Sequence, residues 1–125
     1  RQGEKIALLS FGSMLTPCLA AAEELNATVV NMRFIKPLDD ELVASLAANH
    51  DLLVTVEENT IMGGAGSAVA ESLYKQKIYT KILQLGLPDT FIDQGDHAQM
   101  LANCGLDKDG IIDSVNSTLS NGSLL

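Results

Sequence analysis

Four short runs of apolar and β-branched residues recur along the chain, each with the length of a strand. They are Ile6 to Phe11, Thr28 to Arg33, Leu52 to Val56 and Ile82 to Leu85. The first and third runs are nearly continuously apolar, which is typical of strands covered on both faces. Because the third run is the most apolar, we expect it at the centre of the sheet.

Helical periodicity follows the first two runs. Residues 14 to 25 place apolar side chains on one face, whereas Glu23 and Glu24 face water. A second helix is expected after Asp39, a suitable N-cap, and the carboxylates of Asp40 and Glu41 suit its positive end. The expected buried positions are Met14, Leu15, Cys18, Leu19, Ala22 and Leu25 in the first helix, and Leu42, Val43, Leu46 and Ala47 in the second.

Further elements complete an alternation of strands and helices. Leu38 and Val43 occupy the positions of a hydrophobic staple at the start of the second helix. A third helix extends to about Lys77, a short helix is expected near 97 to 103, and a last one near 108 to 119. Alternation of this kind implies parallel pairing with right-handed crossovers. The sequence therefore predicts a doubly wound, mostly parallel α/β sheet with helices on both faces, forming one domain over residues 1–125 with 120–125 as a frayed tail.

Composition limits the classes of partner. Hydrophobic residues make up 46% and charged residues 19%, which is enough apolar side chain for a packed core. The net charge of -8, the 4% of aromatic residues and the absence of tryptophan argue against binding to nucleic acid and to anionic membranes. No apolar run approaches the ~20 residues that cross a bilayer, so we expect a cytoplasmic protein.

Neither the cysteines nor the start of the chain suggests an independent catalyst. Cys18 and Cys104 show no metal-ligand spacing, and two reduced thiols are expected rather than a disulfide or a metal site. The chain begins with Arg1 rather than methionine and leads directly into a strand, which is expected either of a processed chain or of a piece of a longer protein.

Polar residues follow each predicted strand, where ligands and partners of open α/β sheets are usually bound. They are Gly12 and Ser13, Arg33 and Lys36, Glu57 and Glu58, and the turn Gly86-Leu87-Pro88-Asp89. Glu57 and Glu58 are adjacent on an extended chain, so their side chains point to opposite sides and cannot share a proton. We interpret them as solvated or interface-paired carboxylates, with a cation of another domain as the favoured partner and general-base catalysis as the alternative.

The other candidates also have two interpretations. The loop Gly63-Gly64-Ala65-Gly66 could hold an anion at a helix N-terminus, but no complete dinucleotide or P-loop motif is present, so tight turning and close helix packing are favoured. Arg33 and Lys36 could bind a phosphorylated substrate or form ion pairs with a neighbouring surface. His50 and His97 are expected at helix ends or in loops, and Ser13 lacks the setting of a nucleophile.

Several segments, in order, resemble the last third of the 1-deoxy-D-xylulose-5-phosphate synthases, a family of transketolase-like thiamine diphosphate enzymes. They are Ile6 to Gly12 (IALLSFG), Asn31 to Asp39 (NMRFIKPLD), Leu53 to Ala68 (LVTVEENTIMGGAGSA) and Leu85 to Asp89 (LGLPD). The resemblance covers residues 5 to about 119. It implies a parent enzyme that condenses pyruvate with glyceraldehyde 3-phosphate and releases carbon dioxide, and that acts in isoprenoid, thiamine and pyridoxal biosynthesis.

The resemblance also implies a division of labour between domains. Family members bind thiamine diphosphate and Mg²⁺ between their first two domains through a GDG…N motif and an activating glutamate, and this sequence contains no Gly-Asp-Gly. We therefore expect no catalytic, cofactor or metal residues in this chain, and no activity of the isolated chain. The third domain of the family packs on the pyrimidine-binding domain and supports the homodimer. Candidate interface residues are Arg33, Lys36, Glu57, Glu58, Gly63, Gly64 and Gly66.

Other identities remain open. Transketolase and the β subunits of 2-oxoacid dehydrogenases share this domain architecture, but the EEN…MGGAGS run and the LGLPD turn favour the synthases. A different class of function is an autonomous module that binds an anion or a nucleotide at Gly63 to Gly66. An independent small enzyme with Glu57 or Glu58 as base is a further alternative.

Overall fold

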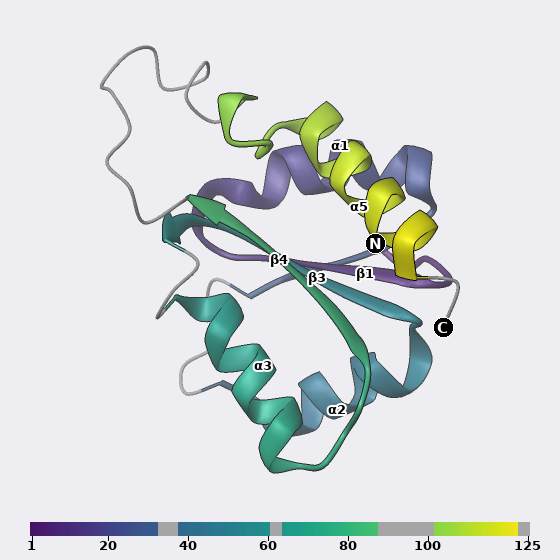
Figure 1. The fold of residues 1–125 in the computed structure, drawn as a ribbon, viewed down its shortest axis with the longest axis vertical. Helices are drawn as coiled ribbons and strands as arrows, with labels where there is room; N and C mark the ends of the chain where they lie inside the picture. The colour runs from purple at the N-terminus through teal and green to yellow at the C-terminus, as the bar shows by residue number, and fades with distance from the viewer. Residues whose placement is uncertain (33–37, 61–63, 88–101, 123–125) are drawn as a thin grey trace.

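The β-rich runs form strands, and the periodic segments between them form helices. The computed structural model describes residues 1–32, 38–60, 64–87 and 102–122 (Figure 1). In chain order the elements are β1 (Ile6–Ser10), the 3₁₀ helix η1 (Gly12–Met14), α1 (Leu15–Leu25), β2 (Thr28–Asn31), α2 (Asp40–Asn49), β3 (Leu52–Thr60), α3 (Ala65–Lys75), β4 (Lys81–Leu87) and α5 (Lys108–Gly122). The predicted α/β class is confirmed.

All four strands pair in parallel, in the order β2-β1-β3-β4. Leu8 of β1 lies beside Val29 of β2 and Val54 of β3, and Val54 in turn lies beside Leu83 of β4. The two most apolar strands, β1 and β3, are therefore the inner ones. This order confirms the central position predicted for Leu52 to Val56.

Helices cover both faces of the sheet, α1 and α5 on one and α2 and α3 on the other (Figure 1). Successive residues of a strand point to opposite faces, so Ile6 and Leu8 enter one core cluster while Ala7 and Leu9 enter the other. The first, here called the α1/α5 cluster, also contains Met14, Cys18, Ala21, Ala22, Ile111 and Val115. The second, the α2/α3 cluster, also contains Val43, Leu46, Val69 and Leu73.

The start of α2 follows the predicted chemistry. Asp39 is its N-cap, and Oδ1 of Asp39 accepts a hydrogen bond of 3.1 Å from the N–H of Leu42. Leu38 packs in the same cluster as Val43, as the predicted hydrophobic staple requires. These local contacts fix the point at which α2 begins.

The predicted burial of Leu19 is wrong. It was expected in the buried stripe of α1, but it is 40% exposed. The small residues Ala21 and Ala22 face the core beside Cys18 and are fully buried. Small side chains allow α1 to approach the sheet closely, and this approach leaves Leu19 at the margin.

Three elements extend beyond their predicted ends, whereas β1 ends at Ser10, before Phe11, and α3 ends at Lys75, before Lys77. β3 runs to Thr60, with an irregularity in its pairing with β4 between Val56 and Thr60, and Gly86 and Leu87 continue β4 instead of forming a turn. The ladder between these strands persists where the apolar pattern stops. α5 reaches Gly122, three residues into the expected tail, because Leu119 packs against the α1/α5 cluster and anchors its last turns. Pro88, Asp89 and residues 97–101 of the expected short helix lie outside the described residues.

Candidate functional site

The carboxyl edge of the sheet, where the polar clusters were expected, is tied together by hydrogen bonds across neighbouring strands. The N–H of Phe11 donates to the carbonyl of Val56 at 2.9 Å, and the N–H of Met32 donates to the carbonyl of Ser10 at 2.8 Å. The Ser10 hydroxyl is buried and donates to the carbonyl of Val30 at 3.4 Å. The backbone at this edge is therefore fixed by the fold itself.

Glu57 forms the most specific contact at this edge. Its side chain is 1% exposed, and its two carboxylate oxygens accept hydrogen bonds from the N–H groups of Ala65 at 2.9 Å and Gly66 at 2.6 Å. These donors belong to the first turn of α3, whose N-cap residue, Gly64, has no side chain to accept them. Glu57 thus caps α3 from the neighbouring strand, and its charge suits the positive end of the helix.

Gly66 allows the helix to lie directly on the strands. A Cβ at this position would lie 2.5 Å from Thr55 Oγ1, 2.9 Å from Glu57 Oε2 and 3.1 Å from Gln84 Oε1. The hydroxyl of Thr55 is buried and has no hydrogen-bond partner within the described part of the chain. Close packing of the glycine-containing loop, the favoured interpretation of its sequence, agrees with this geometry.

Glu57 is not a solvated carboxylate. Its side chain is turned into the domain, and both carboxylate oxygens accept hydrogen bonds from backbone N–H groups. A general base needs access to a substrate proton, and both oxygens of this buried group are already engaged. Glu58 is half-buried, and the expected opposite orientation of the two neighbours agrees with the difference in their burial.

The anion-binding interpretation of the loop does not fit either. The N–H groups of Ala65 and Gly66 would be the donors to an anion at the start of α3, but they already donate hydrogen bonds to the Glu57 carboxylate. A second negative charge at this point would be repelled by the Glu57 carboxylate. Arg33, Lys36 and Gly63 lie outside the described residues, so of the predicted set the structure places Glu57, Gly64 and Gly66 together, with Glu58 beside them in β3.

Thr55 and Gln84 belong to this edge but were not predicted. Both lie inside strands, where their sequence positions indicate sheet residues and nothing more. Their common feature is a side-chain oxygen close to where a Cβ of residue 66 would lie, which is a property of the folded chain. Glycine in the first turn of α3 was the available signal.

His50 is a helix-end residue, as expected, and it also has a structural role. Its ring is buried, with Nδ1 2.8 Å from the carbonyl oxygen of Leu46 and Nε2 2.8 Å from Thr28 Oγ1. Because a carbonyl only accepts, Nδ1 carries the proton, and in the neutral ring Nε2 accepts from the Thr28 hydroxyl. The histidine connects the end of α2 to the start of β2.

The thiols and acidic groups give no metal centre in the residues that the structure describes. Cys18 and Cys104 are free, and burial raises the pKa of the Cys18 thiol from 9.0 to about 12. Across the described ranges, no group of three or more His, Cys, Asp and Glu side chains could hold a metal ion. Within those same ranges, no helix is long and apolar enough to span a membrane.

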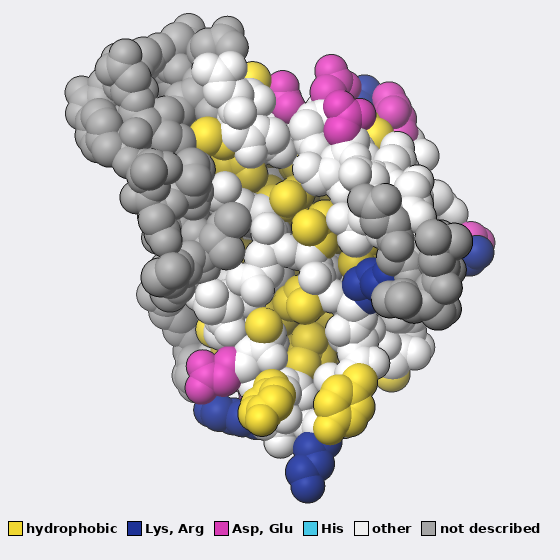
Figure 2. All heavy atoms as spheres, viewed as in Figure 1, with side chains coloured by type: hydrophobic (Ala, Val, Ile, Leu, Met, Phe, Trp, Pro, Cys, Tyr) yellow, Lys and Arg dark blue, Asp and Glu magenta, His cyan; other side chains and the backbone are white. Residues whose placement is uncertain are grey.

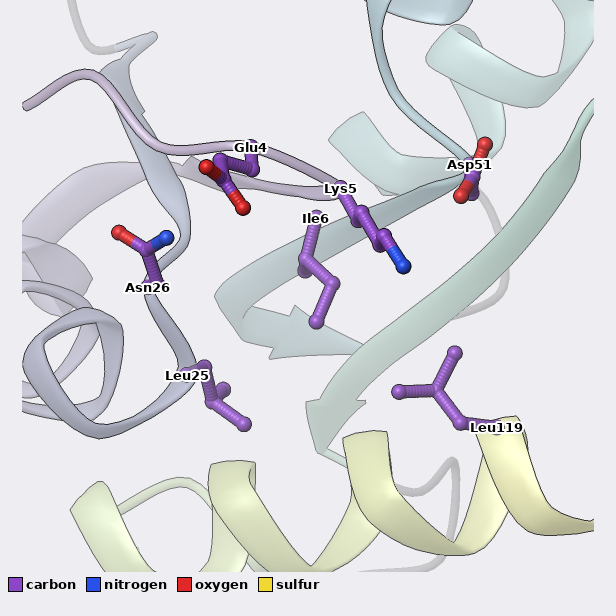
Figure 3. A pocket seen from close by; sticks show the side chains of 7 residues that line it. All are labelled: Glu4, Lys5, Ile6, Leu25, Asn26, Asp51 and Leu119. Atoms are coloured by element: carbon purple, nitrogen blue, oxygen red, sulfur yellow. The ribbon is translucent and has the colours of Figure 1, made fainter.

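A small pocket of about 160 Å³ lies at the opposite, amino edge of the sheet. Figure 3 shows Ile6, Leu25 and Leu119 directed toward its interior, with the charged side chains of Lys5 and Asp51 nearby. Glu4 and Asn26 complete the lining. Of the predicted site residues that the structure describes, none lines this pocket.

Comparison with known proteins identifies the fold family. The profile described as "Transketolase, C-terminal domain" matches residues 1–111. The chain belongs to the transketolase C-terminal domain family. This transketolase C-terminal domain is 72% identical over 115 residues, or 92% of its length, to the 1-deoxy-D-xylulose-5-phosphate synthase of Nitrosospira multiformis. It is 71% identical over 120 residues to the synthase of Nitrosomonas europaea and 58% identical over 113 residues to that of Ralstonia pickettii.

This transketolase C-terminal domain spans about a fifth of the length of those relatives, 19% of the Nitrosospira protein and 20% of the Nitrosomonas protein. A solved structure titled "Split gene transketolase, inactive beta4 tetramer" superposes with a TM-score of 0.86 at 30% identity, over 96% of this chain and 41% of that one. The predicted resemblance to the synthases is thereby confirmed, and so is the transketolase-like fold.

Proposed function

We propose that this chain is the C-terminal domain of a thiamine-diphosphate-dependent 1-deoxy-D-xylulose-5-phosphate synthase. The parent enzyme would condense pyruvate with glyceraldehyde 3-phosphate and release carbon dioxide. The observation that carries the proposal is the 72% identity to the Nitrosospira synthase over 92% of this chain. The identity to the transketolase structure is 30%, so the synthases are the favoured parent.

Bound thiamine diphosphate would supply the carbanion chemistry of the parent reaction, and the described residues of this chain do not fit that group. A diphosphate needs free backbone donors or carboxylates that share a metal ion. The first N–H groups of α3 are engaged by Glu57, and the described residues hold no cluster of metal ligands. We therefore assign thiamine diphosphate, Mg²⁺ and the catalytic residues to the other domains of the parent, and we propose that the isolated chain is inactive.

The proposed role of this domain is to pack on the pyrimidine-binding domain and to support a cytoplasmic homodimer. Arg33, Lys36, Glu58, Gly63 and Gly64 remain candidates for the packing surface. Glu57 and Gly66 would act behind that surface, because they hold the start of α3 against β3 and so fix the shape of the loop in front of it.

A chimera tests the proposal. Residues of the Nitrosospira synthase that align with this chain are replaced by it, and the formation of 1-deoxy-D-xylulose 5-phosphate is measured with pyruvate and glyceraldehyde 3-phosphate. We expect a dimer with kcat/KM within about tenfold of the native synthase. This limit corresponds to a loss of at most about 1.4 kcal/mol of transition-state stabilisation. The isolated chain should show no calorimetric signal with thiamine diphosphate and Mg²⁺.

The matched control replaces the same segment with the C-terminal domain of a transketolase. That chimera has the fold without the synthase-specific surface, and we expect weaker dimerisation and lower kcat/KM. If the chimera containing this chain folded and dimerised but formed no product, the assignment to the synthases would fail. Micromolar binding of thiamine diphosphate by the chain alone would contradict the division of labour.

A further inference from the structure

Both tyrosines of the chain are exposed at the amino edge of the sheet. Tyr74, in the last turn of α3, is 79% exposed, and Tyr79, just before β4, is 89% exposed. Both side chains line a hollow of about 240 Å³, here called the tyrosine hollow, whose other lining residues are Ala70, Leu73, Ile78, Thr80 and Ile82. Leu73 is buried, and Ile78 and Ile82 pack against the α2/α3 cluster, so the hollow opens onto the margin of the core. It can therefore receive an apolar side chain from outside the molecule.

Lysines accompany the tyrosine hollow on a chain that is otherwise acidic. Lys75, Lys77 and Lys81 are three of the eight Lys and Arg residues, and residues 72–88 contain no Asp or Glu, although the net charge of the chain is -8. Lys75 forms an exposed ion pair of 3.6 Å with Glu71, whereas Lys77 and Lys81 form none within the part of the chain that the structure describes. Figure 2 shows hydrophobic and Lys side chains together at the end of the molecule where α3 terminates in Figure 1, and most of the acidic side chains in view lie at the opposite end. Positive charge and apolar surface therefore coincide at this end.

The turn between α3 and β4 has a lysine where glycine is usual. The N–H of Ile78 donates to the carbonyl of Leu73 at 2.9 Å, and the N–H of Lys77 donates to the carbonyl of Tyr74 at 3.1 Å. These two hydrogen bonds define a Schellman motif, in which Lys77 is the left-handed residue with a φ of 58°. A side chain is disfavoured at this position relative to glycine, and that of Lys77 is exposed and gives no packing in return. Such a residue at an exposed position indicates a function outside the fold.

We propose that the tyrosine hollow and its three lysines bind an acidic segment of a partner protein, in which an apolar side chain lies between carboxylates. The apolar side chain would enter the hollow, and tyrosines supply large contact areas at a small cost in conformational entropy. The carboxylates would pair with Lys75, Lys77 and Lys81, which gives electrostatic complementarity around the apolar contact. This surface lies at the opposite edge of the sheet from the capped start of α3, so the packing of domains proposed above does not account for it.

An anionic membrane is the competing occupant. It would attract the same lysines, but most of the remaining charge on this chain is negative and would be repelled by anionic lipid. A peptide segment can contact the patch alone and avoid the acidic surface at the other end of the molecule. The charge distribution therefore favours the protein segment.

Titration of the full-length parent protein with short labelled peptides, followed by fluorescence anisotropy, tests the proposal. We expect Glu-Glu-Leu-Glu-Glu to bind at least about tenfold more tightly than Gln-Gln-Leu-Gln-Gln, which lacks the charges, and than Glu-Glu-Ser-Glu-Glu, which lacks the apolar side chain. Its affinity should fall as the NaCl concentration rises, because salt screens exposed charges. The proposal does not depend on the reaction of the parent, so synthase activity of the same preparation reports separately on the proposed function.

Three results of this titration would overturn the proposal. One is equal affinity for the three peptides, or no binding of any. Another is binding to this chain alone but not to the full-length protein, which would mean that another part of the parent covers the surface. The last is binding to vesicles of phosphatidylserine and phosphatidylcholine by a protein that does not bind the acidic peptide.

Variants of Lys77 separate binding from folding. Lys77→Gly removes the charge and places the preferred residue in the left-handed position, so we expect at least about fivefold weaker binding of Glu-Glu-Leu-Glu-Glu together with a higher urea midpoint of unfolding. Lys77→Arg keeps the charge and should retain binding. Lys108→Ala is the matched control, since it removes one positive charge at the other end of the molecule, where Lys108 pairs with Glu24 at 3.0 Å, and it should leave binding unchanged. Unaltered binding in Lys77→Gly, or a fall in its urea midpoint together with the loss of binding, would show that Lys77 serves the fold alone and would overturn the proposal.

Discussion

The contact between Glu57 and α3 illustrates how a side chain from one element can complete another. Gly64 stands where Ser, Thr, Asp or Asn usually caps a helix, and the missing acceptor comes from β3. A carboxylate accepting from two backbone N–H groups makes charge-assisted hydrogen bonds, which are stronger than those of a neutral amide. The start of α3 and the end of the central strand should therefore be stabilised together.

Replacing Glu57 with Gln measures this contact. The amide can accept only one of the two hydrogen bonds with its oxygen, and its NH₂ group then faces a backbone donor. We expect the free energy of unfolding to fall by about 1–3 kcal/mol, measured by urea denaturation of the chain. Glu23→Gln, at an exposed position of α1, is the control and should cost less than about 0.5 kcal/mol; equal losses in the two variants would contradict the capping role.

Cys18 provides a prediction for pH dependence. Burial raises the pKa of its thiol from 9.0 to about 12 in the folded chain, so the folded state holds this proton more tightly than the unfolded state. The stability from this group is complete below about pH 9 and is lost as pH rises toward 12. Between pH 8 and pH 10, the wild type should lose about 1 kcal/mol more than Cys18→Ala. Parallel stability curves for the two proteins would show that the thiol does not contribute.

For single residues, the sequence predicted contacts between residues close together in the chain and missed contacts between residues on different elements. The N-cap at Asp39 could be predicted because its partner, Leu42, is three positions along the chain. The two partners of Glu57, Ala65 and Gly66, are eight and nine positions away on another element, so the adjacent carboxylates at a strand end were interpreted as surface groups. Burial of Glu57 depends on where α3 packs, which no local pattern records.

Among the elements, the packing of α3 on β3 and β4 depends on one glycine. In an open helix, Gly66→Ala would stabilise the chain by up to about 1 kcal/mol through helix propensity. Here the new Cβ would meet Thr55 Oγ1 at 2.5 Å and Glu57 Oε2 at 2.9 Å, so the helix or the strands must shift. We expect a net loss of about 1–3 kcal/mol, measured by thermal and urea unfolding.

The control for Gly66→Ala is Ala68→Gly on the exposed side of the same helix. This change removes helix propensity without altering a packed contact and should cost about 1 kcal/mol. Gain of stability in Gly66→Ala would show that α3 lies on the strands more loosely than the structure indicates. The sign of the effect, rather than its size, decides between the two descriptions.

Some boundaries of the helices and strands could be predicted from the sequence, and others could not. The predicted strand starts, and the starts of the first, second and last helices, followed apolar runs and caps, and they agree with the structure to within one residue. The ends of β3, β4 and α5 depend instead on pairing or packing with another element, and all three extend beyond the predicted positions. Leu19 failed for a related reason, since the hydrophobicity of a residue does not say on which side of a helix the smaller residues will meet the sheet.

For the molecule as a whole, one sheet separates two core clusters that share no helix. Leu8 points into the α1/α5 cluster and Leu9 into the α2/α3 cluster, and both are fully buried. Their backbones are consecutive residues of the inner strand β1, so loss of packing on one face should loosen the strand that supports the other. The order of the strands, which the sequence indicated only for the central run, makes this coupling possible.

Leu8→Ala and Leu9→Ala test whether the chain is one cooperative unit. Each removes a fully buried side chain and should cost about 2–5 kcal/mol, with a single unfolding transition in both variants. Native-state hydrogen exchange should then accelerate equally at Ile111 in α5 and Leu73 in α3 in either variant, because opening of β1 exposes both faces. Leu19→Ala, at a 40% exposed position, is the control and should cost less than about 1 kcal/mol. Faster exchange confined to the layer that carries the substitution would mean that the two faces unfold independently, in contradiction to a single domain.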